Sequence, residues 1–280
     1  MTDQANQPTS SAPQSTGEMP SSIQELITLA VGNTRSRIGL FRGKELDGSL
    51  VIESSDAEAI AQAAIDLADQ TTGDENPAVV IGSVNSMAAD TIEAALIKTG
   101  LKPIRFGEQT PIPVAHTLDD EGIRTVGQDR LLCAAGAFAH AGQACVVVDL
   151  GTALTIDFVD GEGVFHGGAI APGLDMMLSA LAERTAALPR VQFERDQDEV
   201  IFGKNTPAAM RLGVHAMVNG AVRFLAERYA DFYEAYPRII ATGGDMGVLE
   251  GDELVEAFLP DLQLHGIRVA CERLLASEDE

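Results

Sequence analysis

The chain has 280 residues, of which 45% are hydrophobic and 22% are charged, and its formal net charge is −23. This length allows two domains of ordinary size, and the composition is that of a globular protein. Such an acidic surface repels phosphate backbones, which argues against nucleic-acid binding. No apolar stretch approaches the roughly 20 residues needed to span a membrane.

The N-terminus and the cysteines both favour a cytoplasmic protein. Residues 1–22 are rich in Ser, Thr, Gln and Pro, which predicts a disordered leader, and they lack the basic and apolar regions of a signal peptide. Cys133, Cys145 and Cys271 are widely spaced in apolar contexts. We interpret them as reduced core residues and not as a disulfide or zinc framework.

The first half of the chain alternates strands and helices. A strand is expected at 25–31, followed by a turn at 32–34 and a return strand at 38–41. A helix at 56–69, which Asp56 would cap, a strand at 78–81 and a helix at 86–99 follow. This order predicts a mixed or parallel sheet.

The middle of the chain predicts a connection between two domains. Residues 103–113 suggest an extended segment and residues 119–125 a polar loop, followed by an Ala-rich helix at 131–140. We therefore expect an N-terminal domain over 23–140 and a C-terminal domain over 141–280.

The second half begins with a buried strand, 145–148, that ends on Asp149. Residues 163–173 are too rich in glycine for ordinary strand packing and suggest close backbone approach beside a ligand. Helical periodicity follows at 174–187 and 207–236, the latter with a wide apolar stripe that suggests core or a subunit interface. A strand from Arg238 leads into a glycine pair, and a final helix is expected near 267–275.

Two turns of the sequence look like copies of one phosphate-binding hairpin. Residues 149–156 (DLGTALTI) align without a gap with residues 30–37 (AVGNTRSR), and both segments follow apolar runs. Such turns bring backbone N–H groups to an anion while a carboxylate holds a cation. The plainer alternative is that Asp149 only caps a turn. The duplication favours a repeated α/β unit with a nucleotide between the halves.

Five motifs in order resemble the type III pantothenate kinases, over residues 25 to 275. They are Val31-Gly-Asn-Thr34, Gly127-x-Asp-Arg130, Asp149-x-Gly-Thr-Ala-x-Thr155, Gly167-Gly-Ala-Ile-Ala-Pro-Gly173 and Ala241-Thr-Gly-Gly244. The resemblance implies an α/β fold of duplicated RNase H-like domains (the actin-like or ASKHA superfold), usually as a homodimer. It also implies transfer of the ATP γ-phosphoryl group to pantothenate, which gives 4'-phosphopantothenate in the first step toward coenzyme A.

The same resemblance implies a role for individual residues. Asp129 would be the catalytic base, and Asp149 would bind the activating potassium or ammonium ion. ATP, with Mg²⁺, would contact Thr152 and the first hairpin, which consists of Ala30, Val31, Gly32, Asn33, Thr34, Arg35, Ser36 and Arg37. Pantothenate would contact Gly127, Gln128, Asp129, Arg130 and Thr206.

The residues themselves are consistent with this chemistry. Phosphoryl transfer requires positioning, charge neutralisation and one carboxylate to take the hydroxyl proton. Asp129 offers that acceptor, and the donor fork of Arg130 fits a substrate carboxylate. The alternatives are that this Asp–Arg pair caps the next helix, and that Thr206 is an N-cap preceding Pro207, a role that does not exclude substrate binding. The five histidines show no metal-ligand spacing and are interpreted as structural or solvated.

The sequence departs from the family pattern at the first hairpin. Ala30 stands where the family has an Asp, Arg37 stands where many members have Lys, and no proline follows Ser83-Val84. Because ATP brings its own Mg²⁺, losing the carboxylate at position 30 need not abolish the metal site. The loss should still loosen the γ-phosphate, so we expect a slow kinase with a raised magnesium requirement. The alternative is a nucleotide- or pantothenate-binding regulatory protein without turnover. A sugar or acetate kinase of the same superfold is a more distant alternative.

Overall fold

The computed structural model describes residues 24–73, 76–107, 110–194 and 201–278, so the leader expected at 1–22 lies outside the described residues. The chain divides into two compact units, residues 1–105 and 106–280. None of the described helices is long and apolar enough to cross a membrane.

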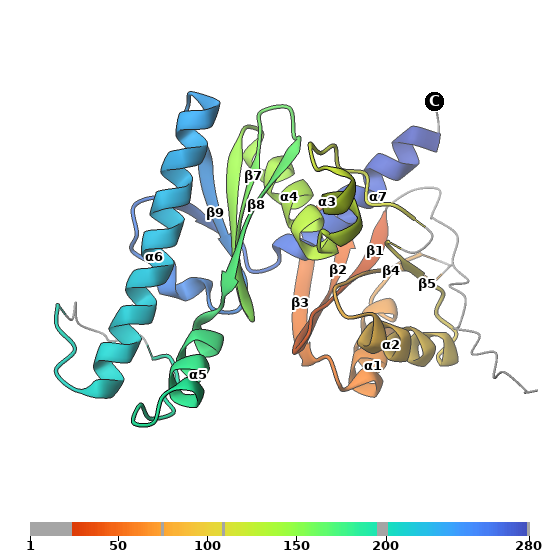
Figure 1. Cartoon of the computed structure of the whole chain (residues 1–280). Coiled ribbons are helices and arrows are strands. Elements are labelled where there is room, and N and C mark those ends of the chain that lie inside the picture. Colours follow the sequence, from red (N-terminus) through yellow and green to blue (C-terminus); the bar gives the residue numbers. More distant parts are fainter. Residues whose placement is uncertain (1–23, 74–75, 108–109, 195–200, 279–280) are drawn as a thin grey trace, which may run out of the picture. The chain divides into compact units, whose positions relative to one another are not determined.

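The first unit is a five-stranded sheet in the order β3-β2-β1-β4-β5 (Figure 1). Strand β1 is antiparallel to β2 and parallel to β4. Its elements are β1 (Glu25–Val31), β2 (Arg35–Arg42), β3 (Glu45–Glu53), α1 (Ala57–Ala68), β4 (Ala78–Ser83), α2 (Ser86–Lys98) and β5 (Pro103–Arg105). Asp56 caps α1 by accepting a hydrogen bond from Ala59 N at 3.0 Å, as predicted.

One face of this sheet is covered by α1 and α2. Ile27, Leu29 and Val31 of β1 point to these helices and share a core cluster with Ile60 and Ile92. Successive side chains of a strand alternate between faces, so Thr28 and Ala30 lie on the opposite face. Ala30, the first residue of the predicted hairpin, is therefore directed away from α1 and α2.

The second unit repeats this topology, with the order β10-β9-β6-β7-β8. Strand β6 is antiparallel to β7 and parallel to β9, as β1 is to β2 and β4. Its elements are α3 (Asp120–Thr125), α4 (Gln128–Ala141), β6 (Cys145–Leu150), β7 (Ala153–Val159), β8 (Phe165–Pro172), α5 (Leu174–Arg184), α6 (Thr206–Tyr233), β9 (Arg238–Thr242), the 3₁₀ helix η1 (Met246–Leu249), β10 (Val255–Phe258) and α7 (Leu262–Glu278).

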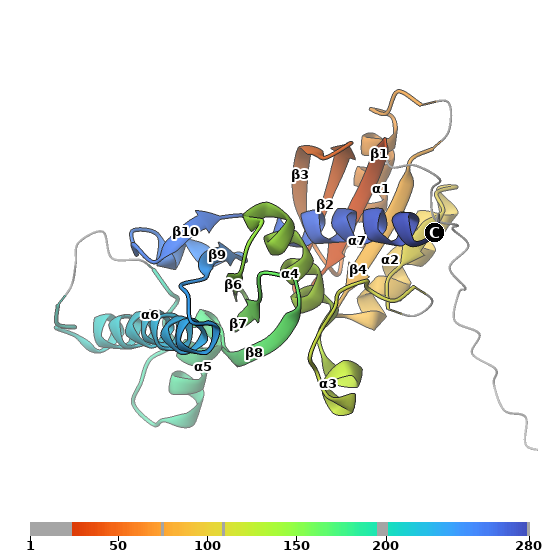
Figure 2. The same ribbon diagram turned by 90° about the horizontal axis from the view of Figure 1, so that it is seen from above.

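The second sheet is covered on both faces by helices of its own unit (Figure 2). Val146 and Val148 of β6 pack with Val214 and Val218 of α6. Cys145 and Val147, on the other face, pack with residues of α4 and α7. All three predicted core cysteines are buried and free. The matching sheet topology confirms the predicted duplication of RNase H-like domains.

The compact units and the predicted duplication divide the chain at different points. Helix α4 follows β5 in the chain as α7 follows β10, so the topology of the repeat places α4 at the end of the first copy. By packing, however, α4 belongs to the second unit, where it contacts β6, β7 and α7. The compact units therefore meet at Arg105 and Phe106, whereas the expected domains meet after residue 140.

Two local predictions were wrong. Residues 119–125 are not a loop, because Asp119 accepts a hydrogen bond from Gly122 N at 2.7 Å and starts helix α3. The whole of strand β8 lies within the glycine-rich segment 163–173, and a Cβ on Gly168 would come 2.0 Å from Ile156 O and 2.5 Å from Asp157 Oδ1. The close approach that requires glycine at this position is therefore to the neighbouring strand.

Candidate active site

The first hairpin is closed by backbone and hydroxyl contacts. Gly32 N donates to Arg35 O at 3.2 Å, and Ser54 Oγ donates to Gly32 O at 2.9 Å. A Cβ on Gly32 would come 2.6 Å from Arg35 O, so only glycine fits this turn. Residues 30–37, the predicted phosphate hairpin, lie together in the first unit.

Ala30 is buried, and the strand pairing shows which residues lie beside it. It is 4% exposed and pairs with Arg37 on β2 and with Gly82 on β4. Gly82 has no side chain, and Arg37 has a cationic one. Ala30 therefore lies beside a residue without a side chain on β4 and beside a cationic residue on β2.

The second hairpin is one residue shorter, so the gapless alignment holds only up to the turn. Gly151 N donates to Ala153 O at 2.9 Å, and Asp149 pairs with Thr155. The gapless alignment would have matched Ile156 with Arg37, the partner of Ala30. A slip of one residue turns a side chain to the other face of the sheet, and Ile156 indeed packs in the α6-side core.

Asp129 and Arg130 lie in the first turn of α4, which begins three residues earlier than predicted. Asp129 Oδ1 accepts a hydrogen bond from Arg130 N at 2.8 Å. Gly127 precedes the helix without a side-chain cap, and a Cβ there would come 2.4 Å from Asp129 Oδ1. The Asp129 carboxylate thus lies against the backbone of the Gly127–Arg130 segment.

The donor fork of Arg130 is engaged within the chain by Asp157. Arg130 Nε donates to Asp157 Oδ2 at 3.0 Å, and Nη2 donates to Oδ1. The guanidinium carbon also lies 5.6 Å from the ring centroid of Phe165. Such bidentate pairing fixes the orientation of both partners. The predicted substrate-binding Arg130 is therefore held in place by a carboxylate and an aromatic ring.

Sequence reasoning did not select Asp157 as a site residue, although it directly follows the second hairpin segment, residues 149–156. It is 1% exposed. On β7 it lies on the same face as Thr155, which pairs with Asp149. A carboxylate alternating with Ile156 and Phe158 in a buried strand was the available signal, because a buried charge requires a partner.

Three carboxylates of this unit, those of Asp129, Asp149 and Asp157, have raised pKa values. The pKa of Asp149 is raised to about 7, first by burial and then by the charges of Asp129 and Asp157. Burial likewise raises the pKa of Asp129, against the lowering effect of its contacts with Arg130. The pKa of Asp157 is also raised by burial, in spite of Arg130. The one cation among them leaves an excess of negative charge.

A second polar cluster, also absent from the sequence predictions, involves His166 of β8. His166 Nε2 lies 2.7 Å from Asp160 Oδ2, and its Nδ1 lies 3.3 Å from Thr117 Oγ1. The contact with His166 and two backbone N–H groups lower the pKa of Asp160. The histidine is therefore hydrogen-bonded at both ring nitrogens, which agrees with the structural interpretation.

The remaining predicted residues divide between the faces of the second sheet. Thr152 lies in the β6–β7 turn, and Gln128 starts α4. Thr206 is not the N-cap of α6, because Asn205 accepts a hydrogen bond from Ala208 N at 2.9 Å. Helix α6 lies on the opposite face of the sheet from α4. The structure thus gathers Gly127–Arg130 beside Asp149, and Thr206 begins a helix on the other face.

The described residues contain no group of three or more His, Cys, Asp or Glu side chains that could hold a metal ion. Asp149 nevertheless fits a single cation, because it is a partly buried carboxylate that also feels the negative charges of Asp129 and Asp157. Gly243, at φ +92°, brings the Leu150 carbonyl to the same point, since a Cβ there would lie 2.3 Å from Leu150 O and 2.5 Å from Asp149 Oδ1.

The sequence model of the type III pantothenate kinase family matches residues 26–228. The chain belongs to the type III pantothenate kinase family. A type III pantothenate kinase from Rhodopirellula baltica is 41% identical over 67% of this chain and 72% of its own length. Another, from Syntrophotalea carbinolica, is 32% identical over 87% of this chain and 97% of its own length. The predicted family is confirmed.

Solved structures confirm the fold at low sequence identity. The activator of 2-hydroxyisocaproyl-CoA dehydratase from Clostridium difficile, with bound ADPNP, covers 91% of this pantothenate kinase chain and 97% of its own at a TM-score of 0.54 and 12% identity. Component A of (R)-2-hydroxyglutaryl-CoA dehydratase from Acidaminococcus fermentans gives a TM-score of 0.50 at 16% identity, over 91% of this chain and 99% of its own.

Proposed function

We propose that this member of the type III pantothenate kinases phosphorylates pantothenate with ATP to give 4'-phosphopantothenate, and that Asp129 is its general base. The observation that carries the assignment of the base is the position of Asp129, a partly buried carboxylate in the first turn of α4 directly before Arg130, which Asp157 holds in place. The reaction is the first step of coenzyme A biosynthesis.

Asp129 has the properties that this reaction requires of a base. In phosphoryl transfer the protein positions the groups, neutralises charge and accepts the hydroxyl proton. A carboxylate with a raised pKa holds that proton better than an exposed one. Since only the ionised form accepts a proton, turnover should fall as the pH drops through this raised pKa. A pH–rate profile with no acidic limb above the ordinary range of carboxylates would argue against the assignment.

Substrate recognition is assigned to the Gly127–Arg130 segment. Because Asp157 engages two donor positions of Arg130, we propose that the guanidinium acts mainly as a fixed positive charge beside Asp129. The Gly127–Gln128 backbone approaches the same carboxylate, and we assign it to pantothenate contact together with Thr206. Loss of pantothenate binding with retention of ATP binding in Arg130→Met, which removes the charge, would support this division. Arg130→Lys, which keeps the charge but loses the fork, should retain more of the pantothenate binding.

ATP is assigned to the two hairpins. Residues 30–37 and Thr152 offer backbone N–H groups, hydroxyls and two arginines to the phosphates, and Mg²⁺ would arrive with ATP. Potassium or ammonium would bind at Asp149, where it would supply positive charge next to the phosphates. The excess of buried negative charge around Asp149 supports a cation at this position.

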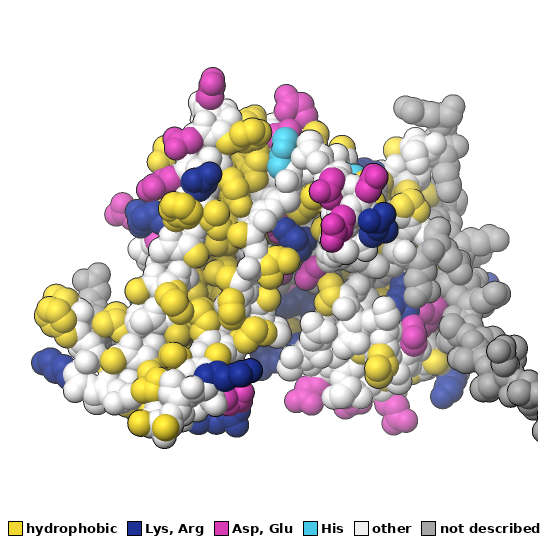
Figure 3. Space-filling model, viewed as in Figure 1, with side chains coloured by type: hydrophobic (Ala, Val, Ile, Leu, Met, Phe, Trp, Pro, Cys, Tyr) yellow, Lys and Arg dark blue, Asp and Glu magenta, His cyan; other side chains and the backbone are white. Residues whose placement is uncertain are grey.

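We further propose a homodimer that forms through α6 and β8. Large apolar side chains gather over these elements in Figure 3. Ile170 of β8 and Met217, Phe224 and Phe232 of α6 are each more than 45% exposed. The buried row of α6 runs along another face of the helix, through Met210, Val214 and Val218. The predicted wide apolar stripe of α6 therefore has one side that packs in the core and another side that would contact a second copy of the chain.

The dimer is testable by mass. Light scattering at micromolar concentration should give the dimer mass for the wild type and a lower mass for Phe224→Lys. Leu50→Lys, which changes an exposed apolar residue of β3, serves as the control and should remain dimeric. A monomeric wild type would contradict the proposal.

Two further assignments complete the proposal. The buried free cysteines support a reducing, cytoplasmic location. The repeated topology supports 23–140 and 141–280 as the two copies of the duplicated domain, with α4 ending the first copy.

The alternative of a regulatory binding protein lacks support, because Asp129, Arg130, Asp149 and Thr152 are all present.

The experiment that tests the proposed function is a coupled ADP-release assay with and without pantothenate. The proposal requires pantothenate-dependent ADP release that is lost in Asp129→Asn. A substrate panel of sugars and acetate distinguishes other kinases of the superfold. Binding of ATP and pantothenate without turnover would favour the regulatory alternative.

A further inference from the structure

Helices α4 and α7 cross so closely that their backbones touch. A Cβ on Gly266 would come 1.9 Å from Leu132 O, and a Cβ on Gly136 would come 2.7 Å from Leu262 O. Only glycine permits this approach at both positions. The crossing therefore fixes the residues of the next turn of each helix relative to one another.

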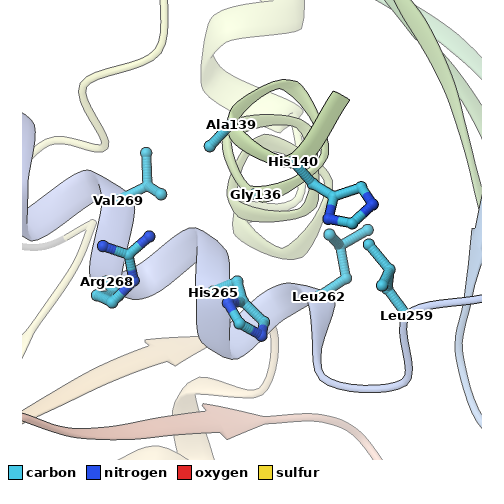
Figure 4. A pocket seen from close by; sticks show the side chains of 8 residues that line it. All are labelled: Gly136, Ala139, His140, Leu259, Leu262, His265, Arg268 and Val269. Carbon is cyan, nitrogen blue, oxygen red and sulfur yellow. The ribbon is translucent and has the colours of Figure 1, made fainter. Parts of the chain in front are cut away.

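A cavity of about 120 Å³ lies beside this crossing (Figure 4). Its lining comes from α4, through Gly136, Ala139 and His140, and from Leu259 and helix α7. A water molecule needs roughly 10–15 Å³ of such space, so the cavity has room for a small ligand. It is smaller than the roughly 300–1,000 Å³ of sites for drug-sized molecules, which excludes a nucleotide as its occupant.

The polar residues that line the cavity are all basic. They are His140 of α4 and His265 and Arg268 of α7, and none of the described residues that line it is acidic. The whole chain has a net charge of −23, so a lining whose polar residues are all basic differs in charge from the protein as a whole. Arg268 is 7% exposed and is oriented by Glu272, one turn further along α7, at 2.5 Å. A buried guanidinium held in this way is a fixed cationic donor.

We infer that the cavity between α4 and α7 binds a small tetrahedral oxyanion of the phosphate type. Two imidazoles and a guanidinium offer N–H donors from both helices, and a phosphate group offers acceptor oxygens in several directions. The glycine crossing holds these donors at a fixed spacing. This site is separate from Asp129 and Asp149, which lie at the other end of α4 and on the sheet.

The protonation of His265 links this binding to pH. Burial, Arg268 and His140 lower the pKa of His265, while Asp261 opposes them. Glu272 is a further charged group here, since it pairs with Arg268 at 2.5 Å. A bound anion favours the imidazolium, so binding takes up a proton. Affinity for phosphate should therefore rise as the pH falls from 8 to 6.

Calorimetric titration of inorganic phosphate tests the site. The full-length protein is first saturated with a non-hydrolysable ATP analogue and pantothenate, so that phosphate cannot bind among the substrates. The structure predicts one remaining phosphate site, with affinity at pH 6 above that at pH 8. Glycerol phosphate, titrated in parallel, distinguishes a phosphomonoester from free phosphate. Acetate at the same ionic strength should not bind.

Three variants locate the binding. His140→Ala removes an exposed side chain, and Arg268→Lys keeps the charge but not the fork; each should weaken phosphate binding about tenfold or more. His116→Ala, an exposed histidine outside the cavity, is the matched control and should bind like the wild type. No phosphate binding to the saturated wild type, equal binding in all variants, or equal binding of acetate would overturn the inference.

Discussion

The two hairpins of this chain share a scaffold and differ in chemistry. In both, a central strand pairs antiparallel with the next strand and parallel with the strand after the first crossover. Ala30 and Asp149 take the same place, two residues before the turn glycine and on the sheet face away from α1 and α2 or from α5 and α6. The first position holds a methyl group, and the second holds a carboxylate.

This difference places the three carboxylates of the candidate site in the second unit. Burial raises the pKa of all three, and the charge of Asp129 further raises the pKa of Asp149 and Asp157. The first hairpin carries backbone N–H groups and the arginines Arg35 and Arg37. A duplicated fold can thus keep its geometry in both copies while one copy loses a charged residue. The predictions below each change one side of this comparison.

The largest effect is expected at Asp129. Asp129→Asn removes the proposed proton acceptor and should lower kcat by about 10²-fold or more, the usual scale of general-base catalysis. ATP binding should persist, because the hairpins are unchanged. Asp120→Asn, in the first turn of α3, is the control. Near-normal turnover in Asp129→Asn would remove this residue from the mechanism.

Restoring the missing carboxylate should raise activity. Ala30→Asp would lie between Gly82 and Arg37 and give the first hairpin the charge of the second. We expect a higher turnover or a lower magnesium requirement, by up to about 10²-fold, the cost of misplacing reacting groups by about 1 Å. Ala30→Asn matches the shape without the charge and should show no gain. Equal kinetics of Asp and Asn variants over a magnesium titration would refute this role.

The pair of Arg130 and Asp157 should contribute strongly to stability. Asp157→Asn leaves a partly buried guanidinium without its counter-charge, which costs on the order of 3 kcal/mol. Urea unfolding measures this loss. Glu183→Gln, which breaks an exposed pair with Arg190, should cost less than about 1 kcal/mol. Similar losses of stability in both variants would show that the buried pair stabilises the fold no more than the exposed pair does.

Asp149 should make stability fall as the pH rises. Its pKa is about 7 in the folded chain and near 3.8 when unfolded, so the folded state holds a proton that the unfolded state releases. This contribution is lost between about pH 4 and 7. In a potassium-free buffer, Asp149→Asn should therefore gain stability relative to the wild type across this range, measured by urea unfolding. Asp175→Asn, an exposed substitution on α5, should show no such trend.

The smallest effect is expected from the monovalent cation. Replacing sodium with potassium should raise the activity of the wild type, because the cation offsets the charge at Asp149. Asp149→Asn makes both hairpins neutral at this position and should abolish the difference. Equal rates of the wild type in the two salts would count against a cation at Asp149.

The sequence predicted those parts of the fold that depend on local pattern. Strands β1, β4 and β6 are apolar runs, and α6 shows clear helical spacing. Helix α3 was missed because its six residues include none that is buried, so it has no periodicity. Strand β8 was missed because Gly168 is needed for the close approach of β8 to β7. That approach becomes known only once the two strands are seen to pair. The one-residue difference between the hairpins likewise depends on register.

The sequence selected those residues of the candidate site that lie in local motifs. Asp129, Arg130 and Asp149 lie in short segments with a recognisable pattern. The partner of Arg130 could not be chosen, because Asp157 is 27 positions away and meets it only through the packing of α4 on β7. The raised pKa of Asp149 has the same origin, since its causes are burial and two carboxylates from other elements.

The measurement that tests the account most directly is ADP release by the wild type and Ala30→Asp, each with and without pantothenate at saturating magnesium. The account predicts pantothenate-dependent release by the wild type and faster release by the variant. If neither protein releases ADP in response to pantothenate while both bind ATP, the kinase reaction and the role of the first hairpin are contradicted together.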